Sequence, residues 1–256
     1  MKKEPYQIMI ESEYIKKQKT RNSIPGFYYI FPIIMNVLLK LPYTRGNLCK
    51  STDKEMLLIQ DLFQFYIYDI AFKIRNIVVL MEIGSYADAT ILFRTLVENF
   101  IIYKYFIKKK DGIGLSNYYE RNTSKSIKDI FEAEIPGYYD DIYSGLCKAS
   151  HGDPLLQGIF RGNMSKDKPL KTNINNINVN FFSYIVNQLF PIIIGVIELY
   201  KLVYPQNILE SSKQEKEQVD IIYKFINDDI EDRKKQFPLQ FKLIEYYNKI
   251  SRFDMF

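Results

Sequence analysis

Histidine, cysteine and tryptophan are scarce in this chain: its 256 residues include one histidine, two cysteines and no tryptophan. A single histidine excludes metal sites built from several histidines and catalysis by a histidine pair, so any acid–base imidazole has to be His151. Cys49 and Cys147 can form neither a metal cluster nor a disulfide framework, which favours a reducing, cytoplasmic location. We therefore expect no metal ion and no other cofactor.

Several familiar catalytic motifs are also missing. The sequence has no glycine-rich phosphate loop, no dinucleotide fingerprint, no CxxC pair, no HExxH and no GxSxG. Charges run through the N-terminal region where a signal peptide needs its apolar core. Two apolar stretches, 24–42 and 180–197, are marginal in length for a membrane span and are interrupted by proline or amide residues, which favours core helices over stable membrane insertion. The alternative is a membrane-perturbing effector that uses these two stretches.

The composition is that of an ordinary globular protein, with 47% hydrophobic and 25% charged residues. The net charge of +5 is spread thinly along the chain. This charge is compatible with nucleic acid as a partner but does not indicate one.

Helical periodicity without strand runs or repeats predicts an all-α fold, a multi-helix bundle. At its centre we expect a long antiparallel helix hairpin, about 53–83 and 85–110, joined by Gly84 and Ser85. A capping box of Thr52 and Glu55 starts the first helix, and Ser85 with Asp88 caps the second. Further helices are predicted at 5–20, 26–41, 115–122, 124–134, 137–151, 179–204, 209–234 and 238–252, with a long loop at 152–178.

The motifs fall in the middle of the chain. We expect an N-terminal helical extension at 1–50, a bundle core that carries the motifs at 51–204, and a C-terminal helical hairpin at 205–256, together one compact unit.

Arg94 and Glu98 are the first candidate site residues. They lie four residues apart in the middle of an apolar stripe of the second hairpin helix, where either charge needs a polar partner. His151 is the other candidate, because Tyr143, Cys147 and His151 share one line of a predicted helix whose C-terminal dipole raises the pKa of the imidazole toward neutrality. The structural alternatives are an ion pair that fixes helix packing and a histidine that caps its own helix.

Two segments carry a family resemblance. ADATILFRTLVENF, with its R-x-x-x-E pattern, is followed about 50 residues later by YSGLCKASHGDP, and this combination resembles an uncharacterised bacterial family of all-helical proteins that we group loosely with the HEPN-like bundles. The resemblance covers roughly residues 55–200. It implies a cytoplasmic bundle of the toxin–antitoxin or phage-defence type, in which many HEPN members are metal-independent, dimeric ribonucleases. HEPN ribonucleases carry an arginine four to six residues before the histidine, and no arginine lies between Arg121 and His151 here, so a site would have to be composite.

The leading hypothesis is therefore a HEPN-like, metal-independent endoribonuclease that acts as a toxin or anti-phage effector. His151 acts as general acid or base, Arg94 stabilises charge on the phosphorane, and Glu98 orients Arg94 or His151. The residues assigned to substrate binding are Lys148, Asp153, Arg161 and Lys166. The expected partners are RNA, an operon-encoded protein and a second copy of the chain. The alternative function is a non-catalytic binding or sensor module of a defence operon, in which Arg94, Glu98 and His151 form a structural polar lock.

Overall fold

The computed structural model describes residues 5–41, 51–150, 179–205 and 213–236. These residues form nine α-helices and one π-helical segment, and no strand occurs among them, which confirms the all-α prediction. The elements in chain order are α1 (Pro5–Ser23), α2 (Pro25–Lys40), α3 (Lys54–Ile83), α4 (Tyr86–Lys109), α5 (Gly112–Tyr119), α6 (Ile127–Glu134), the π-helix η3 (Tyr139–Tyr143), α7 (Ser144–Ser150), α9 (Val179–Val203) and α11 (Lys213–Gln236).

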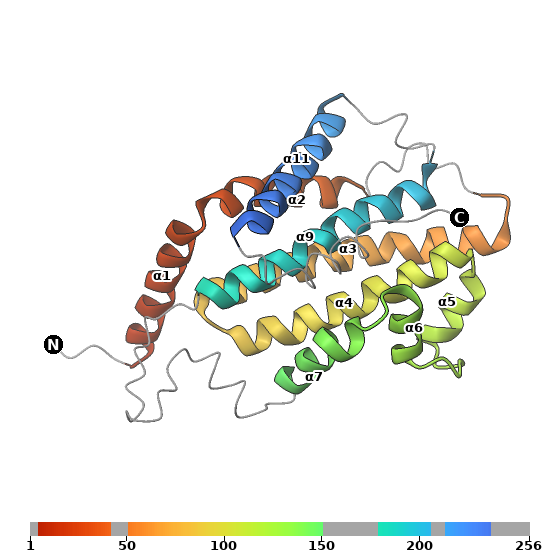
Figure 1. Cartoon of the computed structure of the whole chain (residues 1–256), viewed down its shortest axis with the longest axis horizontal. Coiled ribbons are helices and arrows are strands. Elements are labelled where there is room, and N and C mark those ends of the chain that lie inside the picture. Colours follow the sequence, from red (N-terminus) through yellow and green to blue (C-terminus); the bar gives the residue numbers. More distant parts are fainter. Residues whose placement is uncertain (1–4, 42–50, 151–178, 206–212, 237–256) are drawn as a thin grey trace.

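Helices α3 and α4 form the central pair and run side by side in opposite directions (Figure 1). The turn between them depends on Gly84, whose φ of 81° lies in the left-handed region that glycine adopts without a Cβ clash. The amide of Gly84 donates to the carbonyl oxygens of Leu80 and Met81, which closes the C-terminus of α3. The predicted hairpin and its two-residue connection are therefore correct.

The predicted capping box at the start of α3 is wrong. Asp53 is the N-cap residue, and its Oδ1 accepts hydrogen bonds from the amides of Glu55 at 2.8 Å and Met56 at 3.2 Å. The carboxylate of Glu55 instead accepts from the amide of Ile113 at 2.8 Å. Glu55 thus fastens the first turn of α5 to the first turn of α3.

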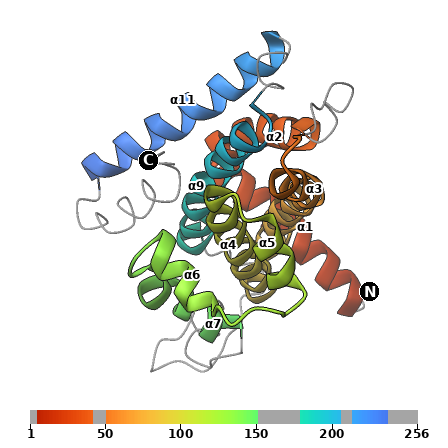
Figure 2. The same ribbon diagram turned by 90° about the vertical axis from the view of Figure 1, so that its right-hand side faces the viewer.

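The other helices cover the central pair on different sides. In the end view of Figure 2, α9 lies along one side of α4, α2 lies beside α3 with α11 beyond it, α6 and α7 lie against α4, and α5 lies against both α3 and α4. One buried amide joins two of these layers: Gln60 Nε2 donates to the carbonyl oxygen of Val203 at 3.0 Å, and the Tyr204 hydroxyl donates to the carbonyl oxygen of Gln60 at 2.6 Å. A buried, paired amide of this kind fixes the position of α9 along α3.

Helix α9 is the one described helix that is long and apolar enough by itself to cross a membrane. Its segment Phe182–Val203 has a mean hydropathy of 1.6 over its most apolar 18 residues, and 78% of that stretch is buried inside the protein. Helices α1 and α2 pass the same test only when taken together, and they are bent by 97° at their junction.

The smaller helices differ in detail from the prediction. Helix α6 begins after Ser126, which forms a capping box with Asp129, and not at Ser124. The helix predicted at 137–151 is divided, because residues 139–143 wind as a π-helix before α7 continues to Ser150. The predicted loop at 152–178 and the final helix at 238–252 lie outside the described residues.

Candidate functional site

Arg94 and Glu98 lie one turn apart on the face of α4 that meets α7. Their side chains are 28% and 29% exposed, so the expectation that both are buried in an apolar stripe is wrong. The short helix α7 covers only part of this face, and solvent reaches both charges. A charged pair at such a position is accessible to a ligand.

The polar group that meets this pair is the hydroxyl of Tyr143, the last residue of η3. Tyr143 is buried, and its hydroxyl donates to Glu98 Oε2 at 2.6 Å. The hydroxyl oxygen of Tyr143 accepts a hydrogen bond from Arg94 Nε at 3.4 Å, whereas the direct approach of Arg94 Nη2 to Glu98 Oε2 is longer, at 3.9 Å. The phenol therefore bridges the guanidinium and the carboxylate, and we name Arg94, Glu98 and Tyr143 the bridged cluster.

The bridged cluster changes the acid–base properties of two of its members. Burial, and then the hydrogen bond to Glu98, raise the pKa of Tyr143 above its usual value. The hydrogen bond to Tyr143 raises the pKa of Arg94, which stays protonated at every physiological pH. The cluster thus presents a permanent cation whose direction is set by a neutral phenol.

Tyr143 reaches α4 because of the π-helix that precedes α7. A π turn contains more residues than an α turn, and such bulges occur frequently at functional sites. The Tyr143 ring packs against Phe131 of α6, with ring centroids 4.6 Å apart, and against Tyr139 at 5.2 Å. These contacts hold the hydroxyl over Arg94 and Glu98.

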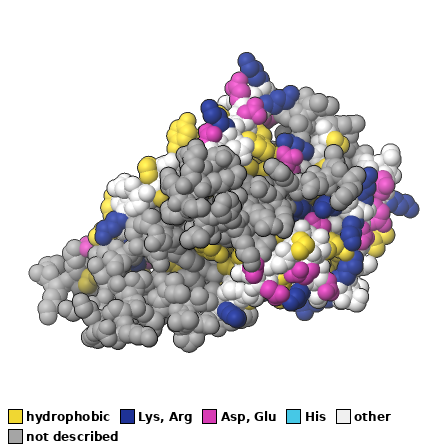
Figure 3. Space-filling model, viewed as in Figure 1, with side chains coloured by type: hydrophobic (Ala, Val, Ile, Leu, Met, Phe, Trp, Pro, Cys, Tyr) yellow, Lys and Arg dark blue, Asp and Glu magenta, His cyan; other side chains and the backbone are white. Residues whose placement is uncertain are grey.

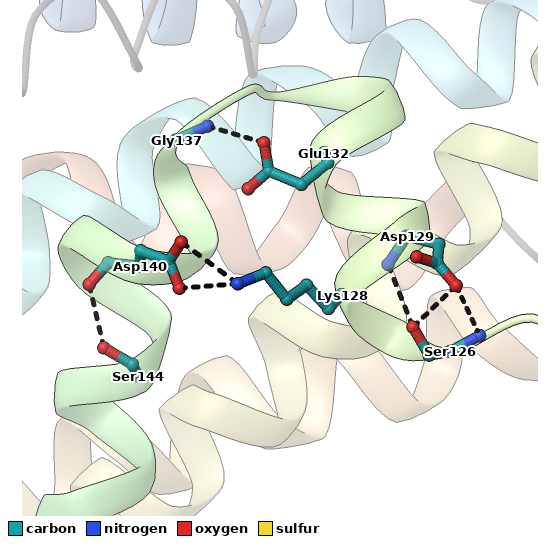
Figure 4. Close-up of polar contacts among 7 residues, drawn as sticks. All are labelled: Ser126, Lys128, Asp129, Glu132, Gly137, Asp140 and Ser144. Carbon is teal, nitrogen blue, oxygen red and sulfur yellow. Dashed lines mark hydrogen bonds and ion pairs between the residues drawn. The ribbon is translucent and has the colours of Figure 1, made fainter.

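A polar network on the outer side of α6 fixes η3 in place (Figure 4). Lys128 Nζ of α6 lies 3.1 Å from both carboxylate oxygens of Asp140 in η3. The amide of Gly137 donates to Glu132 Oε2 at 3.2 Å, and the Ser144 hydroxyl donates to the carbonyl oxygen of Asp140 at 2.8 Å. The π-helix is therefore fastened to α6 before the chain enters α7.

The structure brings together part of the predicted site. Arg94 and Glu98 lie in the bridged cluster, whereas Lys148 is exposed on α7 and forms no hydrogen bond or ion pair with the cluster among the described residues. Cys147, one turn after Tyr143, lies close enough to Arg94 to make a minor contribution to the raised pKa of the guanidinium, after that of Tyr143. The remaining predicted residues, His151, Asp153, Arg161 and Lys166, lie outside the described residues.

Tyr143 is the site residue that the sequence-based assignment missed. Its signal was the line of Tyr143, Cys147 and His151 at four-residue spacing, which pointed toward the histidine and not toward the phenol. Among the residues that the structure describes, no three His, Cys, Asp or Glu side chains converge to hold a metal ion.

Figure 3 shows Lys and Arg interspersed with Asp and Glu at the end of the molecule that carries α5 and α6.

No family model matches the chain, and no curated protein or solved structure is significantly similar to it.

Proposed function

We propose that the chain is a HEPN-like, metal-independent endoribonuclease. The observation that carries this proposal is the bridged cluster: a permanently charged guanidinium, about one quarter exposed, whose direction is set by Tyr143 and Glu98. A fixed guanidinium suits a phosphoryl group, because it offers paired N–H donors to the oxygens on which charge develops.

The second catalytic group of the proposal is His151, which follows the last residue of α7 in the sequence. Tyr143 contacts Arg94, and in the sequence His151 stands at the same four-residue spacing as Tyr143 and Cys147. An imidazole titrates near neutral pH and suits proton transfer to or from oxygen. Lys148, Asp153, Arg161 and Lys166 are the proposed substrate-binding residues.

In the proposed reaction, the 2′-hydroxyl of the RNA attacks the adjacent phosphorus and gives its proton to a general base. The bond to the 5′ oxygen breaks, and that oxygen receives a proton from a general acid, which leaves a 2′,3′-cyclic phosphate and a 5′-hydroxyl. His151 performs one of these two proton transfers. Arg94 stabilises the negative charge on the phosphorane, and Glu98 acts through Tyr143 as a positioning residue.

The proposed setting is the cytoplasm, where the chain acts as a toxin or anti-phage effector with an operon-encoded partner protein. The proposed active form is a homodimer formed through α3. The exposed residues Phe65, Phe72 and Val79 follow one another at seven-residue spacing on its outer face, with 77%, 55% and 37% of their surfaces exposed. An antiparallel pairing centred on Phe72 places Phe65 against Val79 of the second copy and Asp69 beside the amide of its Asn76.

Incubation of the purified chain with structured and unstructured RNA tests the ribonuclease. The wild type is expected to cleave in the presence of a metal chelator and to leave cyclic phosphate ends. Arg94→Ala and His151→Ala are expected to slow cleavage by about 100-fold or more. Lys224→Ala, which removes an exposed charge of α11, serves as the control and is expected to cleave normally. Equal cleavage by all four proteins, or by none, rejects the proposal.

The same variants distinguish the ribonuclease from the second candidate function, a non-catalytic binding or sensor module. The burial of the Tyr143 ring between α6 and α4 favours it, because a buried phenol that joins two helices stabilises packing. On this alternative, no protein cleaves RNA, Arg94→Ala and His151→Ala lower the melting temperature by several degrees, and binding of the partner protein survives.

A further inference from the structure

Two lysines converge on one phenol at the C-terminal end of α4. Lys109 Nζ donates to the Tyr105 hydroxyl oxygen at 2.6 Å, and Lys125 Nζ donates to the same oxygen at 3.1 Å. The two ammonium groups therefore lie at most about 5.7 Å apart. Lys125 comes from the connection between α5 and α6, so two separate segments of the chain bring these charges together. Two like charges at this distance repel each other unless an anion lies close by.

The aromatic rings beneath the lysines hold them in place. Lys109 Nζ lies 4.0 Å from the centroid of the Tyr105 ring, and Lys125 Nζ lies 4.9 Å from the same centroid. Lys125 Nζ also lies 5.5 Å from the ring of Phe106, which is buried and packs edge-on against Tyr105. Cation–π contacts attract ammonium groups to these faces but do not neutralise their charge.

No carboxylate in the described part of the chain forms an ion pair with Lys109 or Lys125, whereas their neighbour Lys108 lies 3.4 Å from Glu134. The phenol oxygen is the acceptor that the two ammonium groups share, and the phenol O–H donates to none of the described residues. The group thus contains seven N–H and O–H donors and a single oxygen to accept them. A cluster of this kind is complementary to an anion with several oxygen atoms.

We infer that Tyr105, Lys109 and Lys125 form a phosphate-binding site. A phosphodiester carries one negative charge and two non-bridging oxygens, which match two ammonium groups and one phenol O–H. The hydrogen bond from Lys109, and after it that from Lys125, lower the pKa of Tyr105, as expected where positive charge is concentrated.

The location of this site connects it to the proposed function. Tyr105 and Arg94 are eleven residues apart on α4, which places them within about 20° on the same face of the helix and about 16 Å apart along it. An RNA strand of a few nucleotides reaches both positions. The inference rests on the proposed function only in naming RNA as the source of the phosphate, and phosphate binding itself requires no cleavage.

Fluorescence anisotropy with a labelled 2′-O-methyl RNA tests the RNA source, because this RNA binds but has no free 2′-hydroxyl to react. The double variant Lys109→Gln, Lys125→Gln is expected to bind at least 10-fold more weakly than the wild type. The slope of log affinity against log salt concentration is expected to fall by about 0.7, since the site holds one phosphate and each phosphate contact in a single strand contributes about 0.7. The control, Lys213→Gln with Lys224→Gln, removes two exposed charges of α11 and is expected to change neither quantity.

Inorganic phosphate tests the site without RNA. The titration of Tyr105 is followed as the tyrosinate absorbance of the wild type minus that of Tyr105→Phe, a variant that keeps both lysines. Bound phosphate is expected to raise the pKa of Tyr105, and the shift is expected to disappear in the lysine double variant, whose melting temperature confirms that it is folded.

The outcomes distinguish the two sources and the two proposals. A phosphate-dependent shift together with unchanged RNA affinity in the double variant identifies a free phosphate or a nucleotide as the ligand and overturns the RNA source. The absence of both effects overturns the site. Weakened binding of the 2′-O-methyl RNA, together with a lack of cleavage of ordinary RNA by the wild type, supports the site and rejects the ribonuclease.

Discussion

The carboxylate of Glu82, near the end of α3, accepts a hydrogen bond of 2.9 Å from Arg21 Nε of α1. The Glu82 side chain is only 3% exposed, and Lys17 Nζ, one turn before Arg21, lies 3.7 Å from its other oxygen. The guanidinium of Arg21 also lies 5.5 Å from the ring of Tyr28 in α2. Three helices of the N-terminal half therefore meet at one buried carboxylate.

Glu82→Gln is expected to lower the free energy of unfolding by about 1–2 kcal/mol, because the amide keeps the shape of the side chain but loses the charge-assisted hydrogen bond from Arg21 and the ion pair with Lys17. Solvent around the half-exposed Arg21 limits the effect. Urea denaturation measures the change. Glu217→Gln removes an exposed partner of Lys213, 4.0 Å away, and should cost less than about 0.5 kcal/mol. Equal losses of unfolding free energy in the two variants would show that the buried carboxylate contributes no more stability than the exposed one.

The central hairpin could be predicted from the sequence because local signals coincide there. Apolar periodicity, the glycine at the turn and the cationic end Lys108 to Lys110 all indicate the same boundaries, which the structure confirms for α3 and α4. The cap at Asp53 was missed because Thr52 and Asp53 both suit an N-cap, and the geometry of the next turn decides between them.

The candidate site was less predictable. The four-residue spacing of Arg94 and Glu98 places them on one face of α4, but it does not reveal how much of that face a short neighbouring helix leaves open. The contact of Tyr143 depends on a π-helix, which breaks the 3.6-residue periodicity used in the prediction. Helical-wheel reasoning therefore could not place its hydroxyl between the two charges.

Tyr143→Phe tests the phenol bridge. Loss of the hydroxyl is expected to lower the free energy of unfolding by about 1–2 kcal/mol, since Glu98 and Arg94 lose their shared partner. A double-mutant cycle with Glu98→Gln should give a coupling energy of about 1 kcal/mol. If Arg94 acts on RNA, cleavage should also slow by about 10-fold with little change in KM, because its direction is no longer set. The control is Tyr139→Phe, at a residue whose ring packs against that of Tyr143. A coupling energy near zero between Tyr143→Phe and Glu98→Gln would contradict the bridge.

Gly112→Ala is expected to destabilise the protein by about 2–3 kcal/mol. A Cβ at this position would lie 2.3 Å from the carbonyl oxygen of Glu55, a backbone atom that cannot move without shifting the start of α3. At Gly145, in α7, a Cβ would meet nothing within 4 Å, so Gly145→Ala should be neutral or slightly stabilising. Thermal denaturation of both variants compares them, and similar melting temperatures would argue against close contact between α5 and α3.

Tyr66→Phe tests the alkaline stability. Burial raises the pKa of Tyr66, so the folded chain retains a proton that the unfolded chain releases near pH 10, and the free energy of unfolding falls above that pH. Each such tyrosine contributes about 1.4 kcal/mol per pH unit to the decline. Because the Tyr66 hydroxyl finds no hydrogen-bond partner among the described residues, Tyr66→Phe should be neutral or stabilising at pH 7.

Urea denaturation between pH 9 and 11 measures this decline. The slope of the free energy of unfolding against pH should be less steep in Tyr66→Phe than in the wild type, by a difference that approaches one proton at pH 11. Tyr14→Phe, at a residue that is 64% exposed, should leave this slope unchanged. An identical slope in all three proteins would mean that Tyr66 ionises as freely in the folded state as in the unfolded state.

Phe72→Glu tests self-association through α3. Phe72 lies at the centre of the exposed apolar stripe, so a two-fold pairing would bring two new carboxylates together and should dissociate the dimer. Light scattering measures the mass, with Tyr29→Glu, at an exposed aromatic residue of α2, as the control. A wild type that is monomeric at all concentrations, or a Phe72→Glu variant that remains a dimer, would rule out this interface.

The π-helix has an evolutionary consequence. A π turn is an α turn with one residue inserted, so deletion of a single residue between Tyr139 and Tyr143 would let the segment rewind as an α-helix. Every later position of α7 would then rotate by about 100° around the helix axis. Such a deletion would carry the phenol away from Arg94 while leaving the central pair of helices untouched. One codon thus separates a descendant that keeps both the architecture and the cluster from one that keeps the architecture alone.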